Sequence, residues 1–234
     1  MNAPDISSHE SFPFPNAGFR GFTLIELLAA IAIVGMLAVL SLAGWNKVVR
    51  SADSAQCLSN LRQIGTAILQ YSADHDGLLP GPCDNSIRTT YRVNNGDLGA
   101  FLAPYWDLPS ADTVTRSARP LMCSAWKRTM KAPEGKCYWS PFRLKGFYNP
   151  GNPTGYYSPF GKGQPDGQPL RLQSILSISG FAAGKQWMIQ DFDKTNASQL
   201  SIDGQAPVPV HGTVRNVLYF DFHAESLPVS TVLD

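Results

Sequence analysis

One carboxylate lies inside a long apolar run near the N-terminus, and its surroundings limit the chemistry open to it. Residues 18 to 40 read GFRGFTLIELLAAIAIVGMLAVL, in which Glu26 is the only charge after Arg20. A carboxylate toward the centre of a bilayer costs about 2.5 to 3.5 kcal/mol on insertion scales, so such a group usually has a partner. Two interpretations are open: Glu26 reaches the lipid headgroups, or it pairs with a buried positive charge.

A second group of chemically active side chains lies near the C-terminus. His211 and Asp221 are separated by nine residues, and His223 follows two positions later. Together with Asp191 they offer imidazole and carboxylate ligands that suit zinc or another divalent ion. The structural alternative, which we prefer, is a hydrogen bond between His211 and Asp221 across the base of a hairpin. We therefore expect no metal and no cofactor.

Catalytic motifs are missing from the sequence. It contains neither GxSxG, which presents a nucleophilic serine, nor HExxH, which holds a zinc ion beside a glutamate base. Asp74 and Asp76 precede Gly77 as in a calcium loop, but no Glu stands at the twelfth position. The sequence predicts that the protein is not an enzyme.

The four cysteines are Cys57, Cys83, Cys123 and Cys137, and no two of them form a CxxC pair. This spacing disfavours a zinc ribbon or a thioredoxin-type site. Disulfides are open to the chain only if it leaves the cytoplasm. Cys123 and Cys137 bracket a short polar loop and are our candidate pair, whereas Cys57 lies in a helical pattern and reads as a small buried hydrophobe.

Composition excludes one broad class of partner. The 234 residues are 44% hydrophobic, with Lys+Arg 19 against Asp+Glu 18 and a net charge of +1. Binding to the polyanionic backbone of a nucleic acid needs clustered positive charge. We therefore expect no nucleic-acid partner.

The elements that must position these residues begin with one long helix. There is no proline from Asn16 to Leu79, and residues 27–45 carry no charge. Nineteen such residues are about enough to cross a ~30 Å hydrocarbon layer. Beyond this predicted span, apolar residues recur every three or four positions, which predicts a continuous helix over 22–72 with one apolar stripe. Gly77 and Pro80 are typical of the helix stop.

The stretch Gly21 to Glu26, GFTLIE, with the apolar run behind it, resembles the N-terminus of type IV pilins and type II secretion pseudopilins. The resemblance implies that a prepilin peptidase cuts after Gly21 and methylates Phe22. It also implies that Glu26 pairs with the N-terminal ammonium of a neighbouring subunit. The physics agrees, because a buried charge is tolerated when a buried opposite charge meets it.

The same resemblance implies a division of the chain. Residues 1–21 are the leader, 22–45 the membrane-spanning and assembly half of the helix, 46–73 its amphipathic half, and 74–234 an exported, β-rich head. The expected location is the inner membrane, crossed once, with the head in the periplasm or on an extracellular filament. The expected partners are prepilin peptidase, other pilin or pseudopilin subunits and the inner-membrane assembly platform.

The expected fold is α+β and pilin-like, with the long helix packed on a small antiparallel sheet and loop-rich insertions. Residues 185–193 read as a strand, and residues 214–229 as a hairpin that turns near Phe222 and His223. The His-x9-Asp spacing resembles a C-terminal motif of a large pilin-like family in which Gly follows the Asp. Phe222 stands in that position here, which puts the tight turn in doubt.

The function implied is that of a structural subunit of a type II secretion pseudopilus or a type IV pilus-like filament. Two alternatives are open. In one, the chain is a minor pilin whose loops between 81 and 170 bind a ligand, a surface or cargo. In the other, it is a membrane-anchored enzyme that uses His211, Asp221 and His223. The aromatic cluster at 137–150 is expected to serve core packing rather than recognition.

Overall fold

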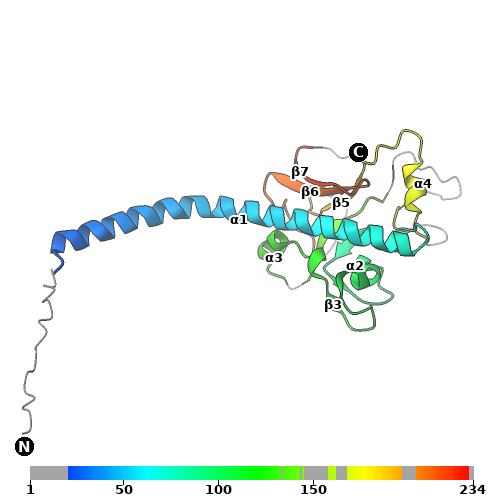
Figure 1. Cartoon of the computed structure of the whole chain (residues 1–234), viewed down its shortest axis with the longest axis horizontal. Helices are drawn as coiled ribbons and strands as arrows, with labels where there is room; N and C mark the ends of the chain where they lie inside the picture. Colours follow the sequence, from blue (N-terminus) through cyan, green and yellow to red (C-terminus); the bar gives the residue numbers. More distant parts are fainter. Residues whose placement is uncertain are drawn as a thin grey trace, which may run out of the picture. The chain divides into compact units, whose positions relative to one another are not determined.

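The apolar N-terminal run and the amphipathic stretch behind it form a single helix, α1, over Leu24–Asp74 (Figure 1). The computed structural model describes residues 21–132, 134–142, 144, 158–161, 168–196 and 204–231, without the side chains of residues 40–44 and 46. The predicted leader therefore lies outside the described residues, apart from Gly21. The chain divides into two compact units, Met1–Trp45 and Asn46–Asp234.

In the first unit, large apolar side chains of α1 are exposed, from Leu24 to Val39. None of the helices in the described part of the chain has an apolar stretch long enough to span a membrane. The side chains of residues 40–44 do not belong to that described part.

The helix ends where the sequence predicts. Gly77 has φ +80°, and its N–H donates to the Ser72 carbonyl at 2.8 Å. A glycine in the left-handed region ends a helix at little steric cost because it has no Cβ. The predicted stop at Gly77 is confirmed.

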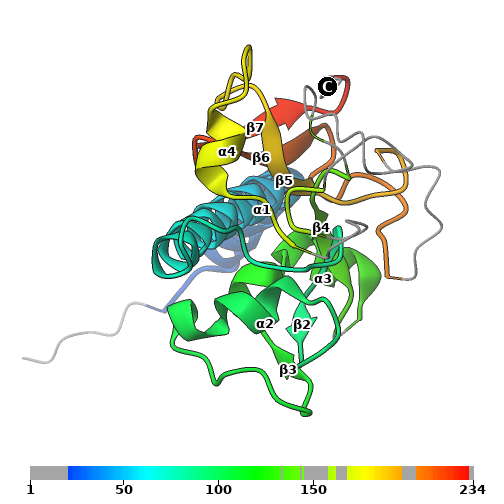
Figure 2. The ribbon, with the colours of Figure 1, turned by 90° about the vertical axis from the view of Figure 1, so that its right-hand side faces the viewer.

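In the second unit, α1 contributes a stripe to the core of the head. Cys57, Leu61, Ile64 and Ile68 are fully buried. The stripe is shorter than the apolar periodicity indicates, because Val48 is 64% exposed. Figure 2 shows this part of α1 between strands β5 to β7 on one side and helices α2 and α3 on the other.

The main sheet has five strands in the order β1-β4-β5-β6-β7, and every neighbouring pair is antiparallel. The strands are β1 (Ser86–Arg88), β4 (Lys136–Trp139), β5 (Trp187–Asp191), β6 (Val214–Tyr219) and β7 (Ala224–Pro228). The predicted strand over 185–193 and the predicted hairpin over 214–229 are both present. All five residues of β5 are buried, since a second apolar cluster around Trp187, Val217 and Tyr219 covers part of the sheet.

The turn between β6 and β7 forms in spite of its phenylalanine. Phe222 has φ +67°, and its N–H donates to the Tyr219 carbonyl at 2.9 Å. The doubt about a tight turn was therefore wrong. The aromatic ring packs against the core, and its burial offsets the cost of the left-handed backbone, which is roughly 1 to 2 kcal/mol for a residue with a Cβ.

The segment between α1 and β5 contains short elements that no sequence period reveals. They are β2 (Thr90–Tyr91), α2 (Leu98–Leu102), η1 (Ala103–Trp106), β3 (Arg116–Ser117), η2 (Arg119–Leu121), α3 (Ser124–Met130) and α4 (Leu172–Leu176). Strands β2 and β3 pair in a separate two-stranded sheet. The expectation of loops over 81–170 misses these helices, since one or two turns are too short to show a helical period. Of the aromatic cluster at 137–150, Tyr138 is in the core, and residues 145–150 lie outside the described part.

Gly65 marks the closest approach of α1 to the hairpin. A Cβ at this position would lie 3.2 Å from a Leu218 methyl carbon and 3.4 Å from the Phe222 ring. We expect Gly65→Leu to lower the free energy of unfolding by about 1 to 3 kcal/mol through overpacking. Gly65→Ala is expected to stay within about 1 kcal/mol of the native chain, because helix propensity offsets the crowding.

Urea denaturation of the full chain measures both effects. The matched control is Thr66→Leu, which places the same side chain at the exposed neighbouring position. Equal unfolding midpoints for Gly65→Leu and Thr66→Leu would contradict the predicted close packing.

Candidate functional site

The first candidate site is the N-terminus of α1, where Thr23 and Glu26 cap the helix. The Glu26 carboxylate accepts the Thr23 backbone N–H at 2.8 Å and its hydroxyl at 3.0 Å. The Glu26 backbone N–H in turn lies 3.3 Å from the Thr23 hydroxyl oxygen. This reciprocal pattern is a capping box, which satisfies donors that the helix start leaves free. Phe22, just before it, is 89% exposed.

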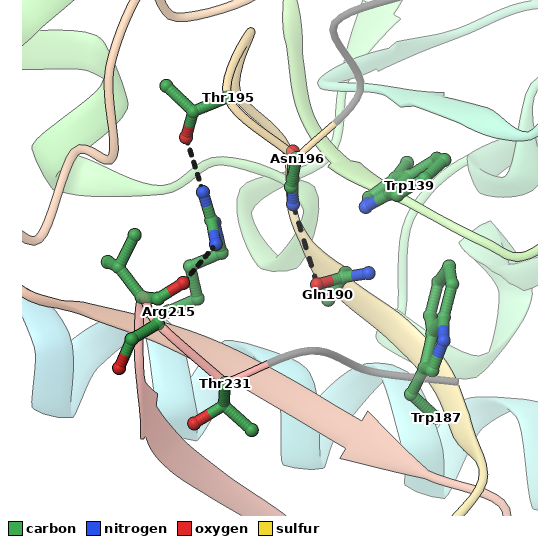
Figure 3. A pocket seen from close by; sticks show the side chains of 9 residues that line it. Trp139, Trp187, Gln190, Thr195, Asn196, Arg215 and Thr231 are labelled. Carbon is green, nitrogen blue, oxygen red and sulfur yellow. Dashed lines mark hydrogen bonds between the residues drawn. The ribbon is translucent and has the colours of Figure 1, made fainter.

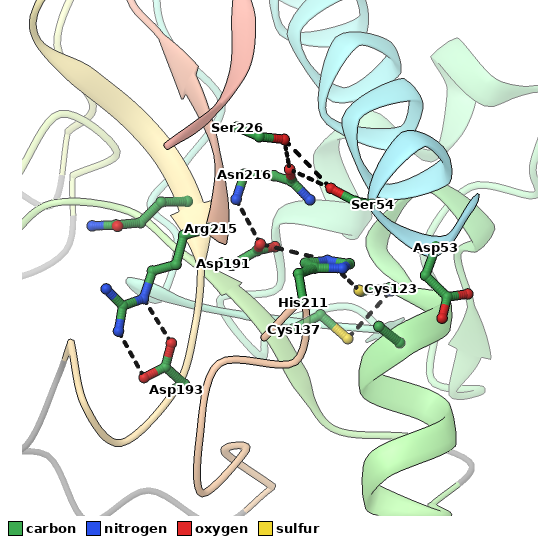
Figure 4. Close-up of polar contacts among 12 residues, drawn as sticks. Asp53, Ser54, Cys123, Cys137, Asp191, Asp193, His211, Arg215, Asn216 and Ser226 are labelled. Carbon is green, nitrogen blue, oxygen red and sulfur yellow. Dashed lines mark hydrogen bonds and ion pairs between the residues drawn. The ribbon is translucent and has the colours of Figure 1, made fainter. Parts of the chain in front are cut away.

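The second candidate site is a buried cluster of two thiols and an imidazole in the head (Figure 4). Cys57 comes from α1, Cys123 immediately precedes α3, and His211 lies in the segment before β6. One ligand atom from each lies within 4.8 Å of the other two, and all three residues are buried. The Cys123 sulfur is 3.4 Å from His211 Nε2. Segments far apart in the chain thus converge on one point.

Asp191, at the end of β5, faces the same imidazole. Its Oδ2 lies 3.6 Å from His211 Nε2, and the two side chains are 4% and 1% exposed. The same oxygen accepts the backbone N–H of Asn216 at 2.7 Å. Among the described residues, Asp191 Oδ1 and His211 Nδ1 have no hydrogen-bond partner. Buried polar atoms nearly always have one, so this site is unusual.

Burial and mutual contact shift the acidity of these groups. Burial raises the pKa of Asp191 to about 7, and it also raises the pKa of Cys123. The pKa of Cys57 is lowered, first by the side-chain hydrogen bond with Cys123 and then by His211. Burial alone would lower the pKa of His211, but Cys57 and Asp191 raise it on balance. Negative charge in the cluster is therefore best accommodated on the Cys57 sulfur.

A hydrogen-bonded row joins this cluster to the hairpin. The side-chain oxygen of Asn216 accepts hydrogen bonds from the Ser54 hydroxyl at 3.1 Å and the Ser226 hydroxyl at 2.6 Å. Asn216 lies on β6 and Ser226 on β7, opposite each other in the register. The row fixes the position of α1 relative to both strands.

The predicted partnership between His211 and Asp221 is replaced by two others. His211 faces Asp191 and Cys123, whereas the exposed Asp221 carboxylate pairs with the His223 ring at 2.5 Å. The reason is the turn itself, which places Asp221 and His223 at its solvent side. The four predicted ligand candidates therefore separate into two pairs, with Asp191 and His211 inside the head and Asp221 and His223 outside.

The cysteines are all free thiols in the structure. The Cys123 backbone N–H points at the Cys137 sulfur at 3.4 Å, so these residues are neighbours. A disulfide between Cys123 and Cys137 stays a prediction. Cys83 lies apart and donates to the Pro80 carbonyl. Sequence reasoning missed Cys57 as a member of the cluster, and the signal that marks it is a thiol on the buried stripe of the helix.

A buried ion pair that the sequence did not indicate lies beside the cluster. Arg215 on β6 forms a two-pronged contact with Asp193, with Nε and one terminal nitrogen at 2.8 and 3.1 Å from the two carboxylate oxygens. The same guanidinium reaches Thr195 Oγ1 at 2.5 Å and the Val229 carbonyl at 3.2 Å. The pair joins the segment after β5 to β6.

The same region borders a pocket of about 300 Å³, shown in Figure 3. Trp139 and Trp187 form one wall, with ring centroids 5.1 Å apart. Gln190, Asn196 and Arg215 contribute polar groups. Asn196 already donates to the Asp191 carbonyl, and Arg215 to Asp193, so most of this polarity serves the fold.

Comparison with known proteins bears on the N-terminal site. Residues 16–42 match the family model described as the prokaryotic N-terminal methylation motif. The chain is 32% identical to the type IV major fimbrial protein FimA of Dichelobacter nodosus over 82 aligned residues. The aligned segment covers 35% of this chain and 48% of that protein. The chain thus spans about half the length of this curated relative. Solved structures gave no significant match.

These two matches agree with the architecture, in which a long N-terminal helix precedes an antiparallel sheet. The methylation motif, the fimbrial relative and the α+β fold together support a resemblance of the chain to type IV pilins and pseudopilins.

Proposed function

We propose that the chain is the precursor of a filament subunit that prepilin peptidase cuts between Gly21 and Phe22 and methylates on Phe22. The observation that carries the proposal is the methylation motif over residues 16–42, placed at the start of a helix whose first turn holds Glu26. The filament is a type II secretion pseudopilus or a type IV pilus-like fibre. The protein acts by polymerising rather than by making a chemical product.

The exposed apolar surface of α1 supports assembly through this helix. Eleven large apolar side chains between Phe22 and Val39 are more than half exposed: Phe22, Leu24, Ile25, Leu27, Leu28, Ile31, Ile33, Val34, Met36, Leu37 and Val39. Such a surface is not left in water. In the proposal it lies in the inner membrane before assembly, with the head exported, and against neighbouring helices after it. The assembly platform in the inner membrane then extracts the subunit.

The capped carboxylate has room for a second partner. Among the residues that the structure describes, Glu26 accepts donors only from Thr23, and a carboxylate has about four acceptor sites. Cleavage after Gly21 creates an ammonium group at Phe22 of each subunit. In the proposal, the ammonium of a neighbour completes the coordination of Glu26 and sets the register between subunits.

Mass spectrometry of the protein from cells with and without active prepilin peptidase tests this function. The expected mature chain begins at N-methylated Phe22, and it keeps its original N-terminus when the peptidase is absent. We expect Gly21→Val to block cleavage. The matched control is Gly35→Val, since an added Cβ meets nothing within 4 Å at either glycine. An uncut, unmethylated native chain in cells with an active peptidase would overturn the proposal.

The enzymatic alternative gains no support from the head. His211 is 1% exposed at its side chain, so a substrate would have no access to it. Asp221 and His223 are accessible, but their side chains bond to each other at the surface, without a nucleophile next to them among the described contacts.

A further inference from the structure

The proposed filament function makes no use of the buried cluster of Cys57, Cys123 and His211, which together with Asp191 leaves polar atoms unsatisfied in the core. The His211 ring interacts with Cys57. Its Nε2 also lies 3.4 Å from the Cys123 sulfur and 3.6 Å from the Asp191 carboxylate. Neither of these two contacts is a strong hydrogen bond. Its Nδ1 and the second Asp191 oxygen have no partner among the described residues. A dry core rarely leaves an imidazole and a carboxylate in this state.

We propose that this cluster is a zinc site, with Cys57 Sγ, Cys123 Sγ and His211 Nε2 as ligands. These three atoms already lie within 4.8 Å of one another. Asp191 Oδ2 lies 3.6 Å from the imidazole nitrogen, but Asp191 is outside that group of three. A closed, structural zinc site has four protein ligands, and Asp191 would supply the fourth by moving toward the sulfur atoms.

Two of the observed spacings fit a tetrahedron around a small ion. With zinc-to-sulfur bonds of about 2.3 Å and zinc-to-nitrogen bonds of about 2.0 Å, a sulfur and a nitrogen ligand lie about 3.5 Å apart. Nitrogen and oxygen ligands lie about 3.3 to 3.4 Å apart in the same geometry. The corresponding distances in the structure are 3.4 Å from Cys123 Sγ to His211 Nε2 and 3.6 Å from that nitrogen to Asp191 Oδ2.

Ligand chemistry decides which metal fits. Two thiolates and an imidazole favour zinc over calcium and magnesium, which take oxygen ligands. Cys137 is not in the group of ligand atoms that lie within 4.8 Å of one another, although its sulfur accepts the Cys123 backbone N–H. A metal ion would also occupy the direction in which the imidazole and the carboxylate now face each other without a good hydrogen bond.

The ligands come from parts of the chain that are far apart, so zinc would act as a cross-link within the head. Cys57 belongs to α1, Cys123 to the turn before α3, Asp191 to β5 and His211 to the segment before β6. The unfolded chain has no such preformed site, and the free energy of binding therefore adds to folding stability. Removing the metal is expected to lower the unfolding temperature of the full chain.

Metal analysis of the full chain tests the proposal. The protein is purified with and without a phosphine reductant, incubated with Zn²⁺ and freed of excess ion. We expect about one zinc per chain, and X-ray absorption with two sulfur neighbours at about 2.3 Å. Cobalt in place of zinc is expected to give the intense visible and thiolate charge-transfer bands of a tetrahedral site. This spectrum needs no variant, so it decides even if substitutions impair folding.

Variants locate the metal. Cys57→Ser and His211→Ala are each expected to lower zinc content at least tenfold, whereas the control Cys83→Ser, another buried thiol away from the cluster, keeps it. Less than one tenth of a zinc per chain under reducing conditions would overturn the proposal. A disulfide that uses Cys57 or Cys123 in the protein from cells, including the predicted Cys123–Cys137 bond, would overturn it as well. So would stoichiometric zinc that survives Cys57→Ser.

Discussion

Glu26→Gln is expected to reduce incorporation of the chain into filaments by at least about 100-fold relative to the native protein. The substitution removes the charge and keeps the shape, so a neighbour's Phe22 ammonium would be buried without its counter-charge. Breaking a buried pair by removing one partner costs about 3 to 5 kcal/mol, and each 1.4 kcal/mol is about a factor of ten in an equilibrium constant. The measurement is the ratio of filament-bound to membrane-bound protein in cells that also express the native chain.

The capping box supplies the control for this experiment. Gln at position 26 can still accept the Thr23 N–H, because capping boxes accept Glu or Gln at this position. Thr23→Ala does the reverse, since it removes the hydroxyl of the cap and leaves the Glu26 charge in place. Its expected cost is only about 1 kcal/mol at the helix start. If Glu26→Gln enters filaments as readily as the native chain, Glu26 does not set the register between subunits. If Thr23→Ala lowers incorporation as much as Glu26→Gln does, the role of Glu26 is helix capping alone.

Asp193→Ala is expected to lower the free energy of unfolding by about 3 to 5 kcal/mol. The side chains of Asp193 and Arg215 are only 2% and 9% exposed, and the guanidinium lies 2.8 and 3.1 Å from the carboxylate oxygens. Without the carboxylate, a charged guanidinium stays buried with only Thr195 and the Val229 carbonyl as acceptors. That uncompensated charge is the source of the cost.

Urea denaturation of the full chain measures this effect against two controls. Asp112→Ala breaks an exposed pair with Arg116, and its expected cost is below about 1 kcal/mol. The double variant Asp193→Leu with Arg215→Met removes both charges, and it is expected to recover most of the lost stability because apolar replacements avoid the desolvation penalty. If Asp193→Ala and Asp112→Ala prove equally mild, the buried pair has no special role in stability.

The parts of the fold that the sequence predicts are those with a local pattern. Helix α1 follows from an uninterrupted run without proline, and the stop at Gly77 follows from one residue that tolerates positive φ. The β6–β7 hairpin follows from alternation on both sides of residue 222. Each of these signals is contained within a few neighbouring residues, which is the range over which periodicity can be read.

The buried site could not be predicted in the same way, because its members meet only through tertiary packing. Cys57 and His211 are 154 positions apart, and no spacing rule joins a thiol on a helix to a histidine in a distant loop. Nearness in sequence favoured Asp221 as the partner of His211, but the fold brings Asp191 to it instead. The fold also brings Cys57 close to Cys123, whose predicted partner Cys137 is its neighbour as well.

The buried stripe of Cys57, Leu61, Ile64 and Ile68 makes the C-terminal part of α1 an integral part of the core of the head. A tensile load that enters the head through this helix is resisted in parallel by all of these side chains and by the row through Ser54 and Asn216. Such a load would therefore be shared among these contacts.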